Sequence, residues 1–323
     1  MNELQLPKVS IVITCFNLDR YIGRAIRSLL AQDCEFEYEI IVIDDASTDR
    51  SVEVIKTFLS DDRVRLMALE ENLGAAAAIN LGWREARGEY FCRFDGDDAW
   101  YPEYLRMAAD VLDRNADVVL VHTDVSFMDS NDVVTSERNN ISRSGRLSPK
   151  DLEFKEILKR YYINAPAIMA RKSSWDKVLP WPEEFRDGLG DWFCTLQMIE
   201  NEFSYFIDRP LAYYRIHQTN MHRSMILNGA AERNMERVFL FFQDRKQISP
   251  SNWNEIRFTH YRHLGFSYYA AGMHNEANRS LSKAVKHKPT AFFDMELMRI
   301  LFATKVGSER YERVKGILKR IWR

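Results

Sequence analysis

Residues 38–49 read YEIIVIDDASTD and contain the pattern that decides the fold. The apolar, β-branched run from Ile40 to Ile43 is typical of a short strand buried on both faces. That run closes on two adjacent acids, Asp44 and Asp45. Beyond the polar AST that follows, apolar side chains recur at helical spacing through residues 51–59. The stretch therefore predicts a strand, an acidic loop and a helix in succession.

The same unit is repeated on both sides of this stretch. Further strands are predicted at VSIVITCF (9–16), VRLMALE (64–70), EYFCRF (89–94) and DVVLVHTDVSFM (117–128). Amphipathic helices are predicted between the first four of the five strands. Apolar strands that alternate with helices indicate an α/β fold built on a mostly parallel sheet flanked by helices. Ligands of such sheets bind beyond the carboxyl ends of the strands.

The rest of the chain suggests two further regions. The polar stretch 129–150 has little periodicity and is predicted to be a flexible loop, and residues 151–225 carry mixed elements. From about residue 226 the pattern is helical to the end. We therefore predict one α/β domain over residues 1–225 and an α-helical C-terminal appendage over residues 226–323.

Composition narrows the class of protein. The chain has 323 residues, 46% of them hydrophobic, and a formal net charge of −2. It can bury a full core and has no global attraction to nucleic acid. Membrane-spanning and secretory-signal patterns are absent from the sequence, and four scattered cysteines fit reduced core thiols, so we expect a cytoplasmic protein.

The octet RFDGDDAW (93–100) concentrates negative charge at another strand end. It places Asp95, Asp97 and Asp98 within four positions directly after an apolar strand. Hard carboxylate oxygens suit Mg²⁺ or Mn²⁺, which bind through one or two carboxylates and substrate phosphates. The alternative is a solvated acidic turn, because Asp is common in turns. An EF-hand is excluded because the sixth loop position is Trp100 and not glycine.

The Asp44–Asp45 pair also has two interpretations. One of these acids can accept a hydrogen bond from a nucleobase, while Ser47 or Thr48 caps the next helix. The alternative is capping alone, which explains one acid but not both. A phosphoacceptor domain would be shorter than this chain and would not carry the third acidic loop. Glycine-rich phosphate loops are absent, so a diphosphate would be held through a metal ion.

Together these segments resemble family 2 glycosyltransferases of GT-A fold. The resemblance rests on VSIVITCFN (9–17), IIVIDDASTD (40–49) and ENLGAAAAINLGWREARGEYFCRFDGDDAWYP (71–102). Fainter likenesses, NAPAIMARKSSW, GLGDWFCTLQM and YYRIHQTNMH, continue to about residue 225. The resemblance implies transfer of a sugar from a nucleotide diphosphate sugar, UDP- or dTDP-linked, to an acceptor hydroxyl with inversion of the anomeric carbon.

The resemblance also assigns residues to the nucleotide part of the donor. It implies that Thr14, Phe16 and Asn17 line the nucleoside pocket. It places Asp45 on the base and Asp95 on the ribose. In the family's DxD motif Asp95 is the first acid.

Metal and base positions follow from the same alignment of motifs. The resemblance implies a Mn²⁺ or Mg²⁺ ion held by Asp97, with Asp98 adjacent and His217 as a further ligand or diphosphate contact. Which of Asp97 and Asp98 is the main ligand stays open, and we favour Asp97. His217 has the alternative of a hydrogen-bonded core histidine. Asp191, in GLGDW, falls at the catalytic base, with the alternative of a helix cap.

The residue types suit this chemistry. An inverting displacement needs one base for the acceptor hydroxyl. It also needs charge stabilisation on the departing diphosphate, which a divalent metal supplies. Glycoside hydrolysis would instead use two carboxylates on either side of the sugar and no nucleotide site. A retaining or otherwise atypical nucleotide-sugar enzyme is the alternative of the same class.

Two positions depart from the family pattern. The family often has an arginine before the asparagine of its alanine-glycine helix, and here Ile79 precedes Asn80. The family's base motif is often Glu-Asp, and here Gly190 precedes Asp191. The first departure leaves the donor's identity open, and the second weakens the assignment of Asp191.

The C-terminal region suggests an interaction module. HYRHLGFSYYAAGMHNEANRSLSKAVKHKP resembles one tetratricopeptide repeat, a helical hairpin at about 258–290. A single repeat must pack on a neighbour, either this chain or another subunit of a homo-oligomer. The tail from residue 305 to 323 has seven basic and two acidic residues and one apolar helical face. It fits either peripheral attachment to an anionic membrane or a helix docked on the protein.

These observations converge on a metal-dependent glycosyltransferase of surface polysaccharide synthesis. The acceptor is expected to be a glycan or a lipid-linked hydroxyl, because many family members use lipid-linked acceptors. The alternative of a different class is a non-catalytic helical-repeat interaction protein with a vestigial nucleotide-sugar pocket. Turnover of a nucleotide sugar separates the two.

Overall fold

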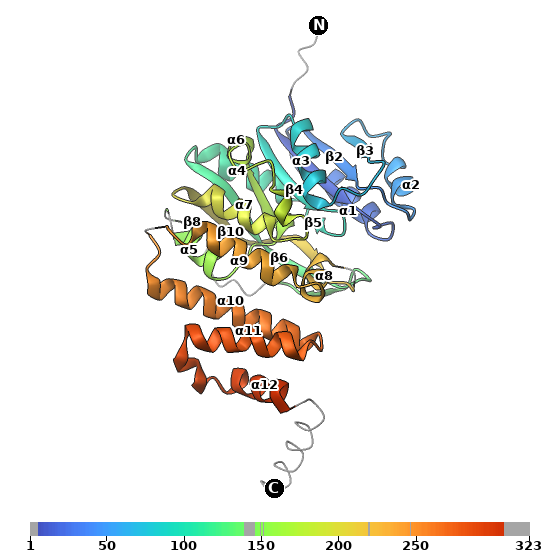
Figure 1. The fold of residues 1–323 in the computed structure, drawn as a ribbon. Coiled ribbons are helices and arrows are strands. Elements are labelled where there is room, and N and C mark those ends of the chain that lie inside the picture. The colour runs from blue at the N-terminus through green and yellow to red at the C-terminus, as the bar shows by residue number, and fades with distance from the viewer. Residues whose placement is uncertain are drawn as a thin grey trace. The chain divides into compact units, whose positions relative to one another are not determined.

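The computed structural model describes residues 6–138, 146–148, 150, 152–218, 220–245 and 247–306. The chain divides into two compact units. The first comprises Met1–Ile157 and Tyr161–Asn220, and the second comprises Leu158–Arg160 and Met221–Arg323. Each unit is described separately below, and the elements are labelled in Figure 1. The predicted basic tail lies almost entirely outside the described residues.

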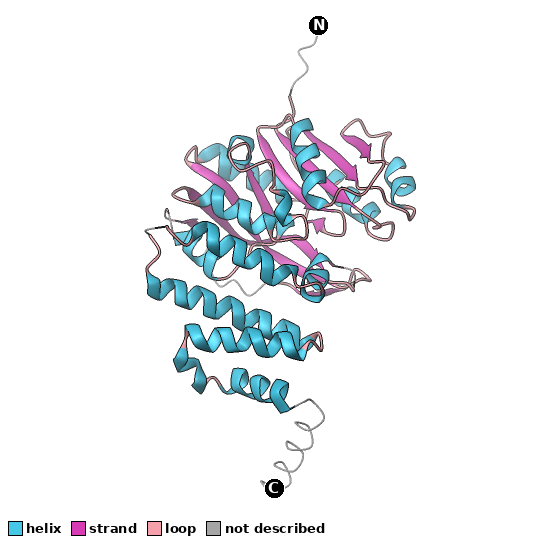
Figure 2. Ribbon diagram, in the orientation of Figure 1, coloured by secondary structure: helices cyan, strands magenta, loops and turns pink. Residues whose placement is uncertain are grey.

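The first unit is an α/β structure with a central sheet flanked by helices (Figures 1 and 2). Its strands are β1 (Val9–Cys15), β2 (Tyr38–Asp44), β3 (Val64–Ala68), β4 (Tyr90–Asp95), β5 (Ala99–Trp100), β6 (Val118–Met128), β7 (Val134–Ser136), β8 (Arg146–Ser148), β9 (Ile168–Arg171) and β10 (Phe203–Arg215). Its helices are α1 (Ile22–Leu30), α2 (Ser51–Lys56), α3 (Ala75–Glu85), α4 (Tyr104–Arg114), α5 (Leu152–Lys159), α6 (Lys172–Trp175) and α7 (Gly190–Ile199). The predicted α/β fold is confirmed.

The strand order places three predicted loops side by side. The described strands pair in the order β3-β2-β1-β4-β9-β6-β10-β5, with β7 on β6 and β8 on β10. Strands β3, β2, β1 and β4 are parallel, and β9 runs antiparallel between β4 and β6. Because β1 lies between β2 and β4, the loops after these three strands open at one edge of the sheet.

Both faces of the central strands are buried, as their continuous apolar sequences predict. Ile11, Ile13 and Ile40 are fully buried on the face that packs on α1. On the other face Val12 packs on α3, where a Cβ added at Gly82 would lie 2.2 Å from Val12 Cγ1. Each fully buried aliphatic side chain contributes about 1.5–3 kcal/mol of transfer free energy. The apolar core thereby fixes the strand ends that carry the polar loops.

The prediction of an unstructured loop at 129–150 is wrong in part. The described part of this stretch contains the short strands β7 and β8. Strand β7 pairs with the end of β6, and β8 pairs with β10. Their sequences carry little signal because the two long neighbouring strands supply the hydrogen-bond partners. Short strands of this kind are specified by the pairing and not by their own apolar pattern.

The second unit is helical. It contains α8 (Met221–Leu227), α9 (Ala230–Phe242), α10 (Pro250–Ala270), α11 (His274–His287) and α12 (Met295–Val306). Ser249 caps α10 by accepting a hydrogen bond from the Asn252 backbone N–H at 3.2 Å, and Pro250 takes the first helical position. Helices α10 and α11 pack against each other through buried Leu264, Ala277 and Leu281. The identification of this hairpin with a tetratricopeptide repeat stays a prediction.

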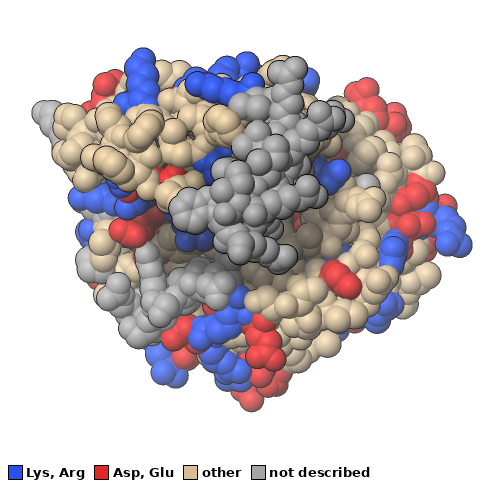
Figure 3. Space-filling view, turned by 90° about the horizontal axis from the view of Figure 1, so that it is seen from below, with Lys and Arg blue, Asp and Glu red and all other residues tan. Residues whose placement is uncertain are grey.

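On the coloured part of the face in Figure 3, Lys and Arg side chains are interspersed with Asp and Glu.

Across the described ranges, each helix is too short or too polar to span a bilayer. The four cysteines are all free thiols, as predicted. Burial raises the pKa of the Cys15 thiol to about 12.

Candidate active site

Three polar loops meet at the carboxyl edge of the sheet. In the parallel register Thr14 of β1 pairs with Asp95 of β4, and Cys15 pairs with Asp44 of β2. The Thr14 hydroxyl donates to Asp95 Oδ1 at 3.5 Å. Residues far apart in the sequence therefore share one edge, because their strands are neighbours. This edge is the candidate site.

The loop after β1 holds the loop after β2. Asn17 adopts a left-handed backbone conformation, with φ of 53°, and its side-chain oxygen accepts from the Thr48 backbone N–H at 2.8 Å. The Ser47 hydroxyl accepts from the Asn17 backbone N–H at 2.9 Å. Phe16 is 46% exposed at this edge, so its ring is free to stack on a planar ligand. The nucleoside-lining roles of Thr14, Phe16 and Asn17 stay predictions.

Asp44 and Asp45 are engaged by backbone donors. Asp45 is buried and accepts from the backbone N–H groups of Leu73 at 2.7 Å and Gly74 at 2.9 Å. Asp44 accepts from the Ser47 backbone N–H at 2.9 Å. Asp45 therefore fastens the chain that leads into α3. Its predicted contact with a nucleobase would use a lone pair that these bonds leave free.

The loop after β4 is electrostatically crowded. Burial raises the pKa of Asp95 to about 6, and Asp97 adds to that rise while the neighbouring Arg93 opposes it. Burial also raises the pKa of Asp98 well above its usual range, and Asp97 and Asp95 add to it. Like charges at short separation favour uptake of a proton or a cation. The loop is therefore prepared to accept positive charge.

Two of the three predicted metal ligands lie together. Asp97 Oδ2 is 2.8 Å from His217 Nε2, with the imidazole brought in directly after β10. Asp98 has a different partner: its Oδ1 accepts from the Arg215 backbone N–H at 2.8 Å, and its Oδ2 is buried without a hydrogen-bond partner among the described residues. The described residues hold no group of three His, Cys, Asp or Glu side chains able to bind a metal ion unaided. Ligation by Asp98 stays a prediction.

Arg215 is a site residue that the sequence analysis missed. Its side chain is 1% exposed, and its Nε donates to the Asp97 backbone carbonyl at 2.6 Å. Its guanidinium also lies 4.6 Å from the centre of the Tyr21 ring. The same ring lies 4.8 Å from the His217 imidazole. Arg215 thus orders the Asp97–His217 pair. The sequence signal that could have identified Arg215 was an arginine within the mostly apolar segment YYRIH.

Asp191 lies across Arg93 from Asp95. It lies in the first turn of α7, where Leu189 and not Asp191 is the N-cap residue. Its Oδ1 accepts from the Trp192 backbone N–H at 2.9 Å, and its Oδ2 accepts from the Tyr161 hydroxyl at 3.1 Å. The side chain keeps 22% exposure. Asp191 is therefore held in place and still accessible, as a base for an external hydroxyl requires.

Arg93 joins Asp191 to Asp95. Its Nη2 donates to Asp95 Oδ1 at 2.6 Å, and its Nη1 lies 3.7 Å from Asp191 Oδ2. Sequence reasoning singled out RFDGDDAW but assigned nothing to its first residue. A basic residue inside an apolar strand was the available signal, because a buried charge needs an acidic partner.

Trp181 contacts Asn80 and fills the space beside Gly190, the residue that replaces the family's glutamate before Asp191. The Asn80 side-chain amide donates to the Trp181 backbone carbonyl at 3.1 Å, and its oxygen accepts from the Trp181 backbone N–H at 2.6 Å. A Cβ added at Gly190 would lie 1.5 Å from Trp181 Nε1, so the indole fills the space of a side chain there. A side chain before Asp191 would therefore clash with the Trp181 indole unless the indole moved.

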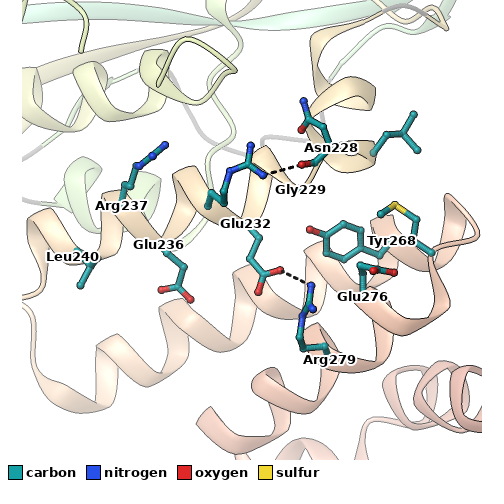
Figure 4. Close-up of a pocket in the computed structure, with 12 residues that line it drawn as sticks. Asn228, Gly229, Glu232, Glu236, Arg237, Leu240, Tyr268, Glu276 and Arg279 are labelled. Carbon is teal, nitrogen blue, oxygen red and sulfur yellow. Dashed lines mark hydrogen bonds and ion pairs between the residues drawn. The ribbon is translucent and has the colours of Figure 1, made fainter. Parts of the chain in front are cut away.

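A hollow of about 660 Å³ lies in the helical unit. Figure 4 shows its lining, with Arg279 paired to Glu232 across it. Arg233 is turned onto the Asn228 backbone carbonyl at 2.8 Å. The charged side chains that line the hollow are largely paired within its wall, so we assign the hollow no ligand.

Comparison with known proteins agrees with the geometry. Residues 10–177 match the family described as glycosyl transferase family 2. An uncharacterized glycosyltransferase of Nostoc sp. is 31% identical over 229 residues, covering 67% of this chain and 67% of the relative. The poly(ribitol-phosphate) beta-N-acetylglucosaminyltransferase TarS of Staphylococcus aureus is 27% identical over 193 residues, covering 50% of this chain and 34% of that protein.

Solved structures show the same fold. The crystal structure of Staphylococcus aureus TarS 1–349 in complex with UDP-GlcNAc matches with a TM-score of 0.58 at 18% identity, covering 92% of this chain and 79% of that one. The crystal structure of TarS matches with a TM-score of 0.64 at 17% identity, covering 95% of this chain and 54% of that one. At these identities the likeness concerns the fold.

Proposed function

The chain belongs to glycosyl transferase family 2 and is a glycosyltransferase; from that premise we propose that it moves a sugar from a UDP- or dTDP-linked donor to a hydroxyl of a glycan or lipid-linked acceptor, with inversion. A relative named for N-acetylglucosaminyl transfer to poly(ribitol-phosphate), and another named for teichuronic acid biosynthesis, support a role in surface polysaccharide synthesis. A solved neighbour that holds UDP-GlcNAc favours a UDP-sugar as donor.

The observation that carries the proposal is the position of Asp191. It is 22% exposed and stands across Arg93 from Asp95, the acid predicted to meet the donor's ribose. In the reaction, Asp191 accepts the proton of the acceptor hydroxyl as its oxygen forms a bond to the anomeric carbon. The bond from that carbon to the diphosphate breaks, and the nucleotide diphosphate leaves on the opposite face of the sugar.

The residues present fit a divalent ion that is shared with the donor. Asp97 and His217 supply one carboxylate and one imidazole 2.8 Å apart, which suits Mn²⁺ or Mg²⁺ bound together with substrate phosphates. When bound there, the ion would offset the negative charge of the departing diphosphate. The chain's own part is to hold Asp97 through Arg215 and to keep His217 against Tyr21.

A nucleotide-release assay tests the proposal. The purified chain is incubated with a panel of UDP- and dTDP-sugars and polyol-phosphate or glycan acceptors, with Mn²⁺ or with a chelator. We expect one donor to be consumed in the presence of Mn²⁺. Asp191→Asn should lower turnover by about 10²- to 10⁴-fold, the usual contribution of a general base.

Asp187→Asn is the matched control, because Asp187 lies in the same segment with a side chain that is 49% exposed. It should retain turnover. Full transfer by Asp191→Asn would place the base elsewhere. Absence of transfer from every donor by the unmodified chain would favour a non-catalytic interaction protein.

A further inference from the structure

Arg93 is buried in the candidate site with part of its hydrogen-bonding capacity unused. It lies on β4, and its side chain is 9% exposed. Among the described residues its Nε and Nη1 have no hydrogen-bond partner, although both atoms are buried. Burying a guanidinium without full pairing is costly. A chain that only needed to fill this part of the core could do so with an apolar side chain.

Two acids of different roles lie on the two sides of this guanidinium. Nη2 is hydrogen-bonded to Asp95 at 2.6 Å, and Nη1 is 3.7 Å from Asp191. Asp95 is the last residue of β4, whereas Asp191 lies in the first turn of α7. At 3.7 Å the second contact is an attraction between charges and not a hydrogen bond. Arg93 therefore links the end of β4 to the first turn of α7.

The environment fixes the guanidinium. Its Cζ lies 5.3 Å from the centre of the Trp181 ring, within the range of a cation–π contact. Trp181 is in turn clamped by the paired hydrogen bonds of Asn80, on α3. The absence of a side chain at Gly190 leaves room for the indole beside α7. Arg93 is thus held against Trp181, which Asn80 of α3 fixes and which packs beside Gly190 of α7.

From these contacts we infer that Arg93 is a positioning residue that sets the distance between the base Asp191 and the donor-side carboxylate Asp95. In this role it acts through Asp95 and Asp191, the two acids that it contacts. Its role is to keep the proton acceptor in register with the anomeric carbon of a donor held at Asp95. The inference rests on the proposed function, because it gives Asp191 the part of base.

The test uses the full chain with the donor and acceptor that it turns over. Arg93→Lys keeps the positive charge but loses the planar fork that reaches two acids at once. We expect kcat to fall by about thirtyfold, since a misplacement of about 1 Å can cost about a hundredfold. KM for the donor should change by less than about threefold, because the charge beside Asp95 is kept.

A double variant separates positioning from general damage. If Arg93 acts through Asp191, Arg93→Lys should lower the residual rate of Asp191→Asn by less than about threefold. Arg171→Met is the matched control: Arg171 is also largely enclosed and donates to the Leu112, Asn115 and Val118 carbonyls, away from the site. It should lower the melting temperature and leave kcat of the folded protein unchanged.

Each other outcome overturns the inference in a recognisable way. A kcat for Arg93→Lys within twofold of the unmodified chain, or an equal loss in both backgrounds, rejects positioning. If Arg93→Lys does not fold, Arg93→Gln takes its place; unfolding of both, with Arg171→Met folded, assigns Arg93 to the core. An unmodified chain that transfers no sugar rejects the proposed function itself.

Discussion

Two acidic loops of the same sheet look alike in sequence and differ in their partners. We call residues 44–49 the first acidic loop and residues 95–98 the second acidic loop. In the first, Asp44, Asp45 and Asp49 accept hydrogen bonds from backbone N–H groups. In the second, Asp95 and Asp97 face the side chains of Arg93 and His217, and among the described contacts only Asp98 accepts from a backbone N–H, that of Arg215. A carboxylate that accepts from backbone N–H groups holds the chain in place. A carboxylate that faces ionisable side chains keeps its charge available for a ligand.

The first test of this comparison is Asp97→Asn in the second acidic loop. We expect sugar transfer to fall by about a thousandfold, the scale of losing one group that stabilises developing charge. The melting temperature should be unchanged or slightly higher, because one of three crowded carboxylates is neutralised. Nucleotide release and thermal unfolding of the same preparation measure both. Turnover that keeps its rate and its metal dependence would remove Asp97 from the site.

The mirror experiment is Asp45→Ala in the first acidic loop. It removes two hydrogen bonds from a carboxylate to backbone N–H groups, at 2.7 and 2.9 Å, in a side chain that is 4% exposed. The free energy of unfolding should fall by about 4 kcal/mol, since hydrogen bonds to charged groups contribute about 1.5–3 kcal/mol each. Urea unfolding measures it. A fully stable Asp45→Ala protein that has lost only donor affinity would make the two loops functionally alike.

Glu153 on α5, outside both acidic loops, is a buried carboxylate that accepts hydrogen bonds from side chains. It serves as a reference for the two loops. Burial alone would raise its pKa, but hydrogen bonds from His122, Tyr162 and Ser148 lower the pKa of Glu153 to about 2. The unfolded chain holds a glutamate near its ordinary value of about 4.3. Because the folded value is the lower one, the stabilisation is complete above about pH 4.5 and is lost as the pH falls towards 2.

The size of this effect is on the order of 3 kcal/mol. We expect Glu153→Gln to flatten the dependence of the free energy of unfolding on pH between about 4.5 and 2, measured by urea titration at several pH values. An unchanged slope would mean that other acids carry the acid sensitivity. The crowded second acidic loop should show the opposite tendency, because neutralising it relieves repulsion.

The smallest effect is expected for an acid outside every loop of the site. Asp110 pairs with Arg114 one helical turn away at 2.8 Å, and their side chains are 48% and 76% exposed. Asp110→Ala should change the free energy of unfolding by no more than about 0.5 kcal/mol and leave turnover unchanged. Thermal unfolding and nucleotide release check it. A larger loss would show that acidic residues matter here regardless of their partners.

Much of the fold followed from local pattern. The strands VSIVITC and YEIIVID, the acidic loops at their ends and the helices between them were all predicted, because a buried parallel strand needs a continuous apolar run. Asp97 and His217, predicted as one metal site, do lie side by side. The short strands β7 and β8 were missed because their partners, and not their own residues, specify them.

What the sequence by itself determined was the sheet, the edge at which polar residues gather and the family to which they point. What only the tertiary structure decided was the partner of each acid. Asp45 fastens the start of α3, with its contact to a nucleobase still a prediction, while Asp98 accepts from the Arg215 backbone N–H. A strand is specified by residues that are adjacent in the sequence. The role of a carboxylate depends on which hydrogen-bond donor the packed core brings to it from elsewhere in the chain.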